Sequence, residues 1–412
     1  MNPESYYHLK PTSAEQVALT GGGFSFACSP AECALLWIPF KKQIWYLKEP
    51  SVEITANGQS CGRQHFGQKL KDWCLIDLSH LAKKEIQAGS QSADVSVHLD
   101  FYGMKVPDSG TLMLFEGQAQ NDGITLIVAP HPDDGELCCS SFYGPKTFLL
   151  TLTAGDKITD LEKQYYKKMD PTLREAGLRK GLLRAWNAVT AGMLGGLSQE
   201  NMICLGYRDG CLEDLLRQKE TTDAPPPATY RLFNSKQTSE RLGLLDDPAN
   251  TFIDLKTEVA AVISRLKPRR IVVTSPFLES HRDHLAAGRL LLDMKNEGLI
   301  GDADLLFYTV HTKRERDIYF GPAGSRITLP RSEKFEALPK GLAFSYVSRE
   351  LDDEAMKRKA IMMNCMHDLY SVRDHRWQPS AHMPYLDSPR MGKAYYFRRF
   401  VKKNEVFLKL EN

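Results

Sequence analysis

The sequence predicts an α/β protein in which a doubly wound parallel sheet is preceded by an all-β, sandwich-like N-terminal domain. Up to about residue 120, short runs that alternate apolar and polar residues are separated by turn signals such as Asn57-Gly58, as in antiparallel strands. Afterwards, continuous apolar runs alternate with helical segments, as in parallel strands covered by helices. We therefore expect domains at 1–120 and 122–405, with the boundary within 118–123.

The N-terminal strands are predicted from runs such as CALLWIPF and SVEITANG, which are rich in β-branched and aromatic residues. Turn signals such as Asp108-Ser109-Gly110 separate several of these runs, and one or two helical turns are expected at 79–89. In order, the expected strands are 33–40, 42–49, 51–58, 72–79, 93–103 and 110–118.

The second domain begins with ITLIVA, an apolar run of the kind that forms a strand buried on both faces. The segment 170–196 is predicted to be a helix, with Asp170 as N-cap, Pro171 at the first position and glycines after its end. Residues 211–250 are polar and proline-rich, and we expect a surface insertion there. The remaining expected strands are 146–156, 201–210, 269–276 and 303–310, and the remaining helices are 254–268 and 284–298.

The composition of the chain bears on which partners and which cellular compartment are expected. The 412-residue chain is 42% hydrophobic and 25% charged, with a net charge of +2, so nothing in it favours nucleic acid as a partner. The N-terminus lacks the apolar core of a signal peptide, and no apolar run is long enough to cross a membrane. Nine cysteines without CxxC spacing suggest free thiols in a reducing compartment, so we expect a cytoplasmic protein without a transmembrane segment.

The first candidate site follows the strand ITLIVA. There His131 is followed by Pro132, Asp133 and Asp134, at the carboxyl end of a strand, where open parallel sheets bind ligands. Adjacent carboxylates repel each other unless a positive charge lies between them. Asp134 as the N-cap of a short helix is the simpler reading, since Asp is favoured at that position.

The second candidate site follows the strand RRIVVT. It offers His281, Asp283 and His284 just before a helix. If the two strands are neighbours, His131, Asp134 and His284 form a two-histidine, one-carboxylate set with an open position, the composition of catalytic zinc sites. Zinc lowers the pKa of bound water to roughly 7. Iron and manganese also suit a His/carboxylate set.

At these residues the sequence resembles the LmbE-like (PIG-L) family of metal-dependent de-N-acetylases. The resemblance rests on His-Pro-Asp-Asp at 131–134 and His-x-Asp-His at 281–284, with weaker similarity in LLTLTAGD, LGYRDG and LREAGLRKG. It covers about 122–370 and implies a Rossmann-like sheet. The chain departs from the family pattern at Arg282, where proline is usual, and at Cys138, where glycine is frequent.

The resemblance implies a role for each motif residue. His131, Asp134 and His284 would be the metal ligands. Asp133 would be the general base, and His281 would steady the tetrahedral intermediate and protonate the departing amine. These roles suit amide hydrolysis, because the amine leaves poorly unless it is protonated and the developing oxyanion needs a group to stabilise it.

Four further residues are candidates for substrate binding. Arg174 and Arg179 both fit the substrate-binding arginine that the resemblance implies, and solvation of a helix face is the alternative for each. Asp209 could touch substrate or simply shape the turn before Gly210. Asp283 is the fourth candidate.

We therefore expect a metal-dependent hydrolase, with zinc as the first choice of metal, that removes the N-acetyl group from an N-acetylated amino sugar in a glycan or glycoconjugate. A β domain and an insertion that carries Tyr230 and Phe233 could grip such a substrate. One alternative is an amidase of a small thiol-cofactor precursor. Another is a glycan-binding protein without catalysis. The sequence does not fix the oligomeric state.

Overall fold

The computed structural model describes residues 3–29, 33–43, 48–81, 93–116, 123–161, 168–218, 224–312, 319–331, 338–366 and 395–411. By their contacts the residues form two compact units. Unit 1 comprises Met1–Asn121, Thr312–Met356 and Leu386–Asn412, and unit 2 comprises Asp122–His311 and Lys357–Tyr385. Our boundary at 118–123 lies mostly outside the described residues, and the division into 1–120 and 122–405 stays a prediction.

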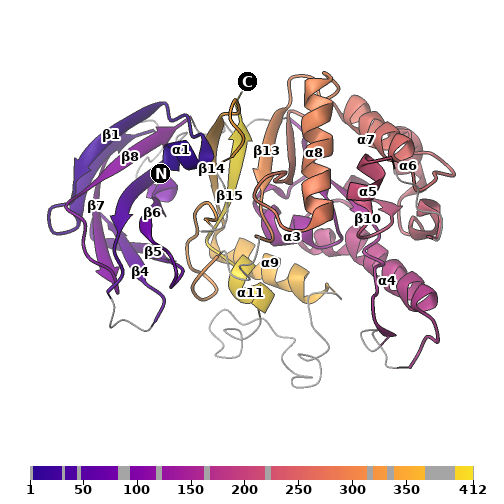
Figure 1. Ribbon diagram of the computed structural model, residues 1–412, viewed down its shortest axis with the longest axis horizontal. Coiled ribbons are helices and arrows are strands. Elements are labelled where there is room, and N and C mark those ends of the chain that lie inside the picture. The colour runs from indigo at the N-terminus through magenta and orange to yellow at the C-terminus, as the bar shows by residue number, and fades with distance from the viewer. Residues whose placement is uncertain are drawn as a thin grey trace. The chain divides into compact units, whose positions relative to one another are not determined.

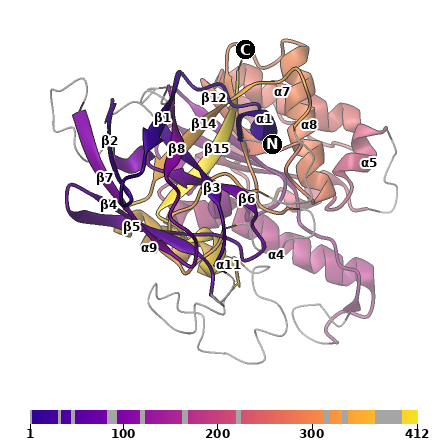
Figure 2. The ribbon, with the colours of Figure 1, turned by 60° about the vertical axis from the view of Figure 1, so that its left-hand side comes forward.

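Unit 1 contains two four-stranded antiparallel sheets, which confirms the predicted antiparallel character of the N-terminal region (Figure 2). One has the order β1-β8-β3-β6 and the other β2-β7-β4-β5. Their strands are β1 (Ser13–Ala18), β2 (Gly23–Cys28), β3 (Cys33–Phe40), β4 (Ser51–Ala56), β5 (Gln59–His65), β6 (Asp72–Asp77), β7 (Ala93–Tyr102) and β8 (Ser109–Phe115). The strand expected at 42–49 and the helical turns expected at 79–89 lie largely outside the described residues.

The two sheets share one apolar core. Alternate residues of each strand point inward, as in Val52 and Ile54 of β4 and Val95, Val97 and Leu99 of β7. Unit 1 also contains α1 (Pro3–Tyr7), α11 (Tyr395–Phe400) and the antiparallel pair of β14 (Phe344–Glu350) and β15 (Asn404–Leu410).

Unit 2 is built on five parallel strands in the order β11-β10-β9-β12-β13, of which β10 and β13 are labelled in Figure 1. These are β9 (Thr125–Ala129), β10 (Thr147–Thr153), β11 (Met202–Tyr207), β12 (Arg270–Thr274) and β13 (Asp304–Tyr308). All but one of their residues are buried, as expected for strands covered on both faces. The predicted parallel-rich sheet is thus confirmed, and β9 lies in its middle, beside β12.

The longer helices of unit 2 are α4 (Leu173–Leu194), which contacts β11, α7 (Phe252–Leu266), and α8 (Arg282–Asn296), which contacts β12. The prediction that Asp170 caps α4 is wrong. Thr172 is the N-cap, and its hydroxyl oxygen accepts a hydrogen bond from the amide of Glu175. The hydroxyl group of Thr172 also donates a hydrogen bond to Glu175 Oε2 at 2.7 Å, whereas Asp170 pairs with Arg179.

The described residues of the segment 211–250 form three short helices, α5 (Leu212–Leu216), η4 (Pro227–Tyr230) and α6 (Lys236–Leu242). Tyr230 and Leu242 are buried, so part of the expected surface insertion packs into unit 2. The remaining elements are α3 (Asp134–Cys138), η1 (Ser140–Phe142), η3 (Gln199–Asn201) and α9 (Asp353–Asn364). Within the described part of the chain, no helix combines the length and apolar character that spanning a bilayer requires.

Candidate metal centre and active site

The first motif lies where β9 ends. The chain turns directly after Pro130, and the amide of Asp133 donates a hydrogen bond to the carbonyl of His131 at 2.9 Å. The amide of His131 donates to Asp134 Oδ2 at 3.0 Å, which fixes this carboxylate beside the imidazole. Asp133, and not Asp134, occupies the N-cap position of α3 and makes no capping hydrogen bond with its side chain. The simpler reading of Asp134 as a helix cap is therefore wrong.

The second motif lies at the same edge of the sheet. β12 pairs in parallel with β9, with Val273 opposite Val128, so the carboxyl ends of both strands meet there. The chain then enters α8, with His281 at the N-cap position. The hydroxyl of Thr274 donates to the carbonyl of His284 at 2.8 Å and ties the first turn of α8 to the end of the strand.

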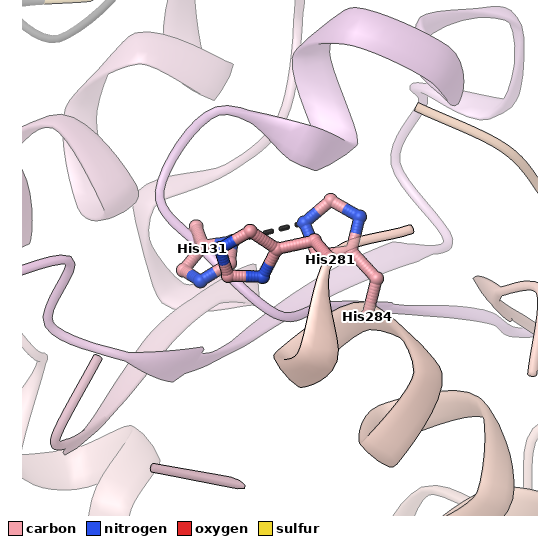
Figure 3. Close-up of side chains that lie close together, drawn as sticks. All are labelled: His131, His281 and His284. Atoms are coloured by element: carbon pink, nitrogen blue, oxygen red, sulfur yellow. Dashed lines mark hydrogen bonds between the residues drawn. The ribbon is translucent and has the colours of Figure 1, made fainter. Parts of the chain in front are cut away.

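Three possible ligand atoms converge at this edge, and Figure 3 shows the two side chains His131 and His284 that supply two of them. His131 Nδ1 lies 3.0 Å from His284 Nε2. Asp134 Oδ2 lies 3.3 Å from the first nitrogen and 3.2 Å from the second. Donors about 2.0–2.2 Å from a tetrahedral ion lie about 3.3–3.6 Å apart. The observed separations are close to these values, so the three residues fit a single metal ion.

The second ring nitrogen of His131, Nε2, faces two more carboxylates. His131 Nε2 lies 3.2 Å from Asp209 Oδ1 and 3.3 Å from Asp283 Oδ2. Asp283 also accepts hydrogen bonds from the amides of Gly210 (2.6 Å) and Leu212 (3.1 Å). Asp209 and Asp283 therefore hold the ring of His131, so that Nδ1 points to the ligand cluster.

Glu279 holds the ring of His284 in the same way, and it was not among the residues expected from the sequence. Its Oε2 lies 3.2 Å from His284 Nδ1, and its carboxylate accepts hydrogen bonds from the amides of Val310 and His311. The side chain is fully buried. The only signal in the sequence was an acidic residue two positions before the motif, which is too common to be diagnostic.

The electrostatics of the cluster favour positive charge. Burial alone would lower the pKa of His284, but the carboxylates of Asp134 and Glu279 raise it to about 10. Asp209, with Asp134 and Asp283, likewise outweighs burial and raises the pKa of His131 well above its usual value. Conversely, His284 and His131 outweigh burial and hold the pKa of Asp134 well below its usual range. A buried site with this excess of carboxylates stabilises a cation between the two imidazoles.

His281 differs from the other two histidines. Its ring centroid lies 4.7 Å from that of His131 and 5.0 Å from that of His284, and the three rings are seen together in Figure 3. Burial and the neighbouring His131 and His284 lower its pKa to about 4. Its Nδ1 is buried and has no hydrogen-bond partner among the described residues. His281 thus stands beside the ligand cluster with a ring nitrogen available to a bound molecule.

Asp133 is held by an arginine that we had not singled out. Arg184 Nη2 lies 2.9 Å from Asp133 Oδ2 and 3.4 Å from the carbonyl oxygen of Pro132. Arg184 is only 4% exposed and projects from α4. Of the two arginines that we had considered on this helix, Arg174 is exposed and Arg179 is half-exposed and pairs with Asp170 at 2.7 Å. Arg184 is the arginine of α4 that reaches the first motif.

A second group of possible ligands lies in unit 1, but its two carboxylates already have other partners. It consists of Asp77, His80 and Glu350. Both carboxylate oxygens of Glu350 accept hydrogen bonds from Arg326 (2.8 and 2.9 Å). Asp77 accepts from Ser79, Ser348 and Asn404. A buried guanidinium beside these carboxylates disfavours a cation, so we interpret the group as a network that links β6, β14 and β15.

Several solved structures resemble the chain weakly. GalB, the 4-carboxy-2-hydroxymuconate hydratase of Pseudomonas putida KT2440, covers 70% of this chain and 96% of its own at 13% identity, with a TM-score of 0.35. A deacetylase triple mutant from the teicoplanin biosynthetic pathway covers 70% and 98% at 13% identity, with a TM-score of 0.30. These values establish nothing about activity. No curated protein sequence matches the chain.

A family profile, in contrast, matches the region of the site. The profile is PIG-L, GlcNAc-PI de-N-acetylase, and it aligns with residues 126–295. This stretch runs from β9 to α8 and includes both His/Asp motifs. It is also the region in which the sequence resembles the LmbE-like proteins. Residues 126–295 of this chain are therefore a PIG-L domain.

Proposed function

We propose that the chain is a metal-dependent hydrolase that removes the N-acetyl group from an N-acetylated amino sugar. The observation that carries the proposal is the convergence of His131 Nδ1, His284 Nε2 and Asp134 Oδ2 within 3.0–3.3 Å of one another, with Asp133 next in the chain. The match of residues 126–295 to the PIG-L profile supports the reaction class.

In this proposal His131, Asp134 and His284 hold the ion, and zinc is the first candidate because of the ligand types. A bound zinc ion would polarise the amide carbonyl and lower the pKa of water. Asp209, Asp283 and Glu279 keep the two imidazoles in the tautomers that leave His131 Nδ1 and His284 Nε2 free to act as ligands.

Asp133 is the proposed general base. Its carboxylate would take a proton from the attacking water, which requires an oxygen aimed at the substrate side of the turn. Arg184 contacts Oδ2 and thereby fixes the plane of the carboxylate. Orientation of this kind contributes to the rate because a small displacement of a catalytic group is costly.

His281 is the proposed partner of the leaving group. An imidazole N–H at its position can donate a hydrogen bond to the oxyanion of the tetrahedral intermediate. It can also relay to the departing nitrogen the proton that Asp133 removes from water, so that His281, whose pKa is lowered, begins and ends the turnover as a neutral imidazole. The protons then balance over one turnover, and the products are acetate and a free amine.

The substrate class is part of the proposal and rests on the family resemblance. Tyr230 gives no support to a glycan grip, because it is 1% exposed and donates its hydroxyl to Asp156. Phe233 packs against Trp186 with their ring centroids 5.1 Å apart. We keep an N-acetylglucosamine-type glycan or glycoconjugate, such as a cell-envelope polysaccharide or lipopolysaccharide intermediate, as the proposed substrate.

Two broader features complete the proposal. The strand order β11-β10-β9-β12-β13 supports a Rossmann-like, doubly wound sheet, because it is the order 3-2-1-4-5 of that fold. Eight of the nine cysteines are described as free thiols, which supports a reducing compartment such as the cytoplasm.

The test is the release of acetate from a panel of N-acetylhexosamine glycosides, nucleotide sugars, lipopolysaccharide-core oligosaccharides and N-acetylated thiol conjugates. The zinc-reconstituted protein should release acetate from a sugar, and a chelator should abolish this activity. Asp133→Asn should lower kcat by roughly 10²- to 10⁴-fold with its metal content retained, because it removes only the general base.

Each arm can contradict the proposal. Full activity of Asp133→Asn would refute the assigned base, and full activity after removal of the metal would refute metal dependence. Release of acetate from thiol conjugates alone would move the protein to the alternative substrate class and leave the chemistry in place.

A further inference from the structure

We propose that Tyr230, in the segment between β11 and α7, is a positioning residue for the metal ligand His131. It acts through Asp156 and Asp209, which link its hydroxyl group to the imidazole. This inference rests on the proposed function, because it assigns a task to a residue outside the two motifs at the same site.

The first link joins η4 to the loop after β10. Tyr230 Oη donates a hydrogen bond to Asp156 Oδ2 at 3.1 Å. Tyr230 is 1% and Asp156 is 5% exposed, so water does not readily replace either partner. A buried carboxylate depends on such donors, because an unsatisfied acceptor is expensive away from solvent.

The second link joins this carboxylate to the site. Asp156 Oδ1 accepts a hydrogen bond from the amide of Asp209 at 2.9 Å. The side chain of the same residue lies 3.2 Å from His131 Nε2. Because the amide and the carboxylate belong to one residue, a shift of Asp156 moves the group that orients the imidazole.

Close packing holds the tyrosine ring in place. A methyl group on Gly181 of α4 would come within 2.4 Å of Tyr230 Cε1 and 2.8 Å of Asp156 Cβ. Gly206 of β11 has a positive φ of 79°, and a side chain there would come within 2.4 Å of the carbonyl oxygen of Pro227. Both glycines allow η4 to approach closely, which keeps the ring of Tyr230 packed beside Asp156.

The experiment compares Tyr230→Phe with the wild-type full chain. This variant keeps the ring and removes only the hydroxyl. We expect its affinity for Co²⁺, measured by competition with a chelator, to fall by roughly 3- to 10-fold. Loss of a residue that contacts a metal ligand directly lowers metal affinity by roughly 10- to 100-fold, and Tyr230 lies two residues further away, behind Asp156 and Asp209. The visible absorption of bound Co²⁺ should change as well, since it reports the geometry of the ligands.

Tyr207→Phe is the matched control. Tyr207 is also fully buried in unit 2, and its hydroxyl donates to a buried carboxylate, Glu258 Oε2, at 2.9 Å. Glu258 is held by Arg231 and by the amide of Leu245, not by a motif residue. Both variants should shift the unfolding midpoint by a similar amount, but Tyr207→Phe should change Co²⁺ affinity by less than about twofold.

A double-mutant cycle with Asp209→Asn tests whether Tyr230 acts on His131 through Asp209. If Tyr230 acts through Asp209, Tyr230→Phe should have little further effect on Co²⁺ affinity in the Asp209→Asn protein. Equal affinities in the two tyrosine variants would overturn the inference, and so would full additivity in the cycle. Wild-type protein that fails to bind Co²⁺ would instead contradict the metal site of the proposed function, and this inference would fall with it.

Discussion

At the scale of single residues, the candidate site depends on which group each of the two imidazole nitrogens faces. His131 turns Nδ1 toward the ligand cluster and Nε2 toward Asp209 and Asp283. His284 does the reverse, with Nε2 in the cluster and Nδ1 facing Glu279. The carboxylates behind each ring select the tautomer, and this selection prepares two bare nitrogens for a cation.

Glu279→Gln should therefore weaken metal binding without removing a ligand. Glutamine keeps the volume but loses one acceptor, so it cannot satisfy the amides of Val310 and His311 together with His284 Nδ1. We expect metal affinity to fall by roughly 10- to 100-fold, as measured by chelator competition. Glu297→Gln, on the surface beside Lys256, is the control, and equal affinities in the two variants would contradict the role of Glu279.

Arg184→Met should separate catalysis from metal binding. The change removes the 2.9 Å contact with Asp133 but leaves His131, Asp134 and His284 in place. We expect kcat for acetate release to fall by roughly 10²-fold because the base loses its orientation, with metal content unchanged. Arg217→Met, which removes an exposed pair with Glu213, should retain activity. A loss of bound metal in Arg184→Met would show that Arg184 supports the ligands instead.

At the scale of elements, α4 shows what a single sequence reveals about a helix. Its extent was predicted closely, because glycines and a capping residue lie at its ends. Its cap was misplaced by two positions, because Asp170 and Thr172 are both good N-caps and only the packed structure decides. Which arginine faces the site depends on the rotation of the helix, and the sequence does not contain that information.

Gly181→Ala should destabilise α4, although alanine is usually the better helix former. In an open helix the change would stabilise by about 0.5–1 kcal/mol. Here the new methyl group would meet the ring of Tyr230 at 2.4 Å, and overpacking typically costs about 1–3 kcal/mol. Urea unfolding should show a net loss, which should shrink in a Tyr230→Ala background. A gain in stability would contradict the close packing of η4 on α4.

The five parallel strands of unit 2 and the two motifs could be predicted because their signals are local. Five continuous apolar runs became β9 to β13, and the motifs follow β9 and β12. The contacts of Glu279 and of Tyr230 could not be predicted, since they depend on backbone amides and carboxylates that are distant in sequence. The packing of η4 was missed because proline and polar residues on either side of Tyr230 suggested an exposed loop.

At the scale of the whole molecule, each unit has an apolar interior of its own. In unit 1 the apolar residues of two antiparallel sheets meet in one core, and β14 and β15 join this unit from far along the chain. In unit 2 the parallel strands are buried almost throughout. The polar groups that suit catalysis lie at the carboxyl ends of β9 and β12, and so belong to unit 2.

Unit 1 should lose stability in mild acid through His65. Burial, with Lys402 and Arg63 nearby, lowers the pKa of His65 to about 4. The neutral form therefore stabilises the fold above the unfolded pKa of about 6.5, and this contribution is lost as the pH falls toward 4. We expect a loss on the order of 2 kcal/mol, allowing for partial exposure.

The comparison of His65→Gln with wild type isolates this contribution. Denaturant unfolding at pH 7 and pH 4 should show a smaller loss in the variant, because glutamine does not titrate. His98→Gln, on an exposed part of β7, should lose as much as wild type. Identical losses in all three proteins would contradict a role for His65.

The pairing of β9 with β12 has a consequence for the kinetics of folding. The pairing of these two strands places His131 beside His284, which lies 153 positions further along the chain. Closing a loop of this length costs conformational entropy before any contact compensates for it. A cation bound by both histidines would link the segments that follow these two strands. Since such a connection forms only after the strands have paired, its effect falls on the rate of unfolding and hardly on the rate of folding.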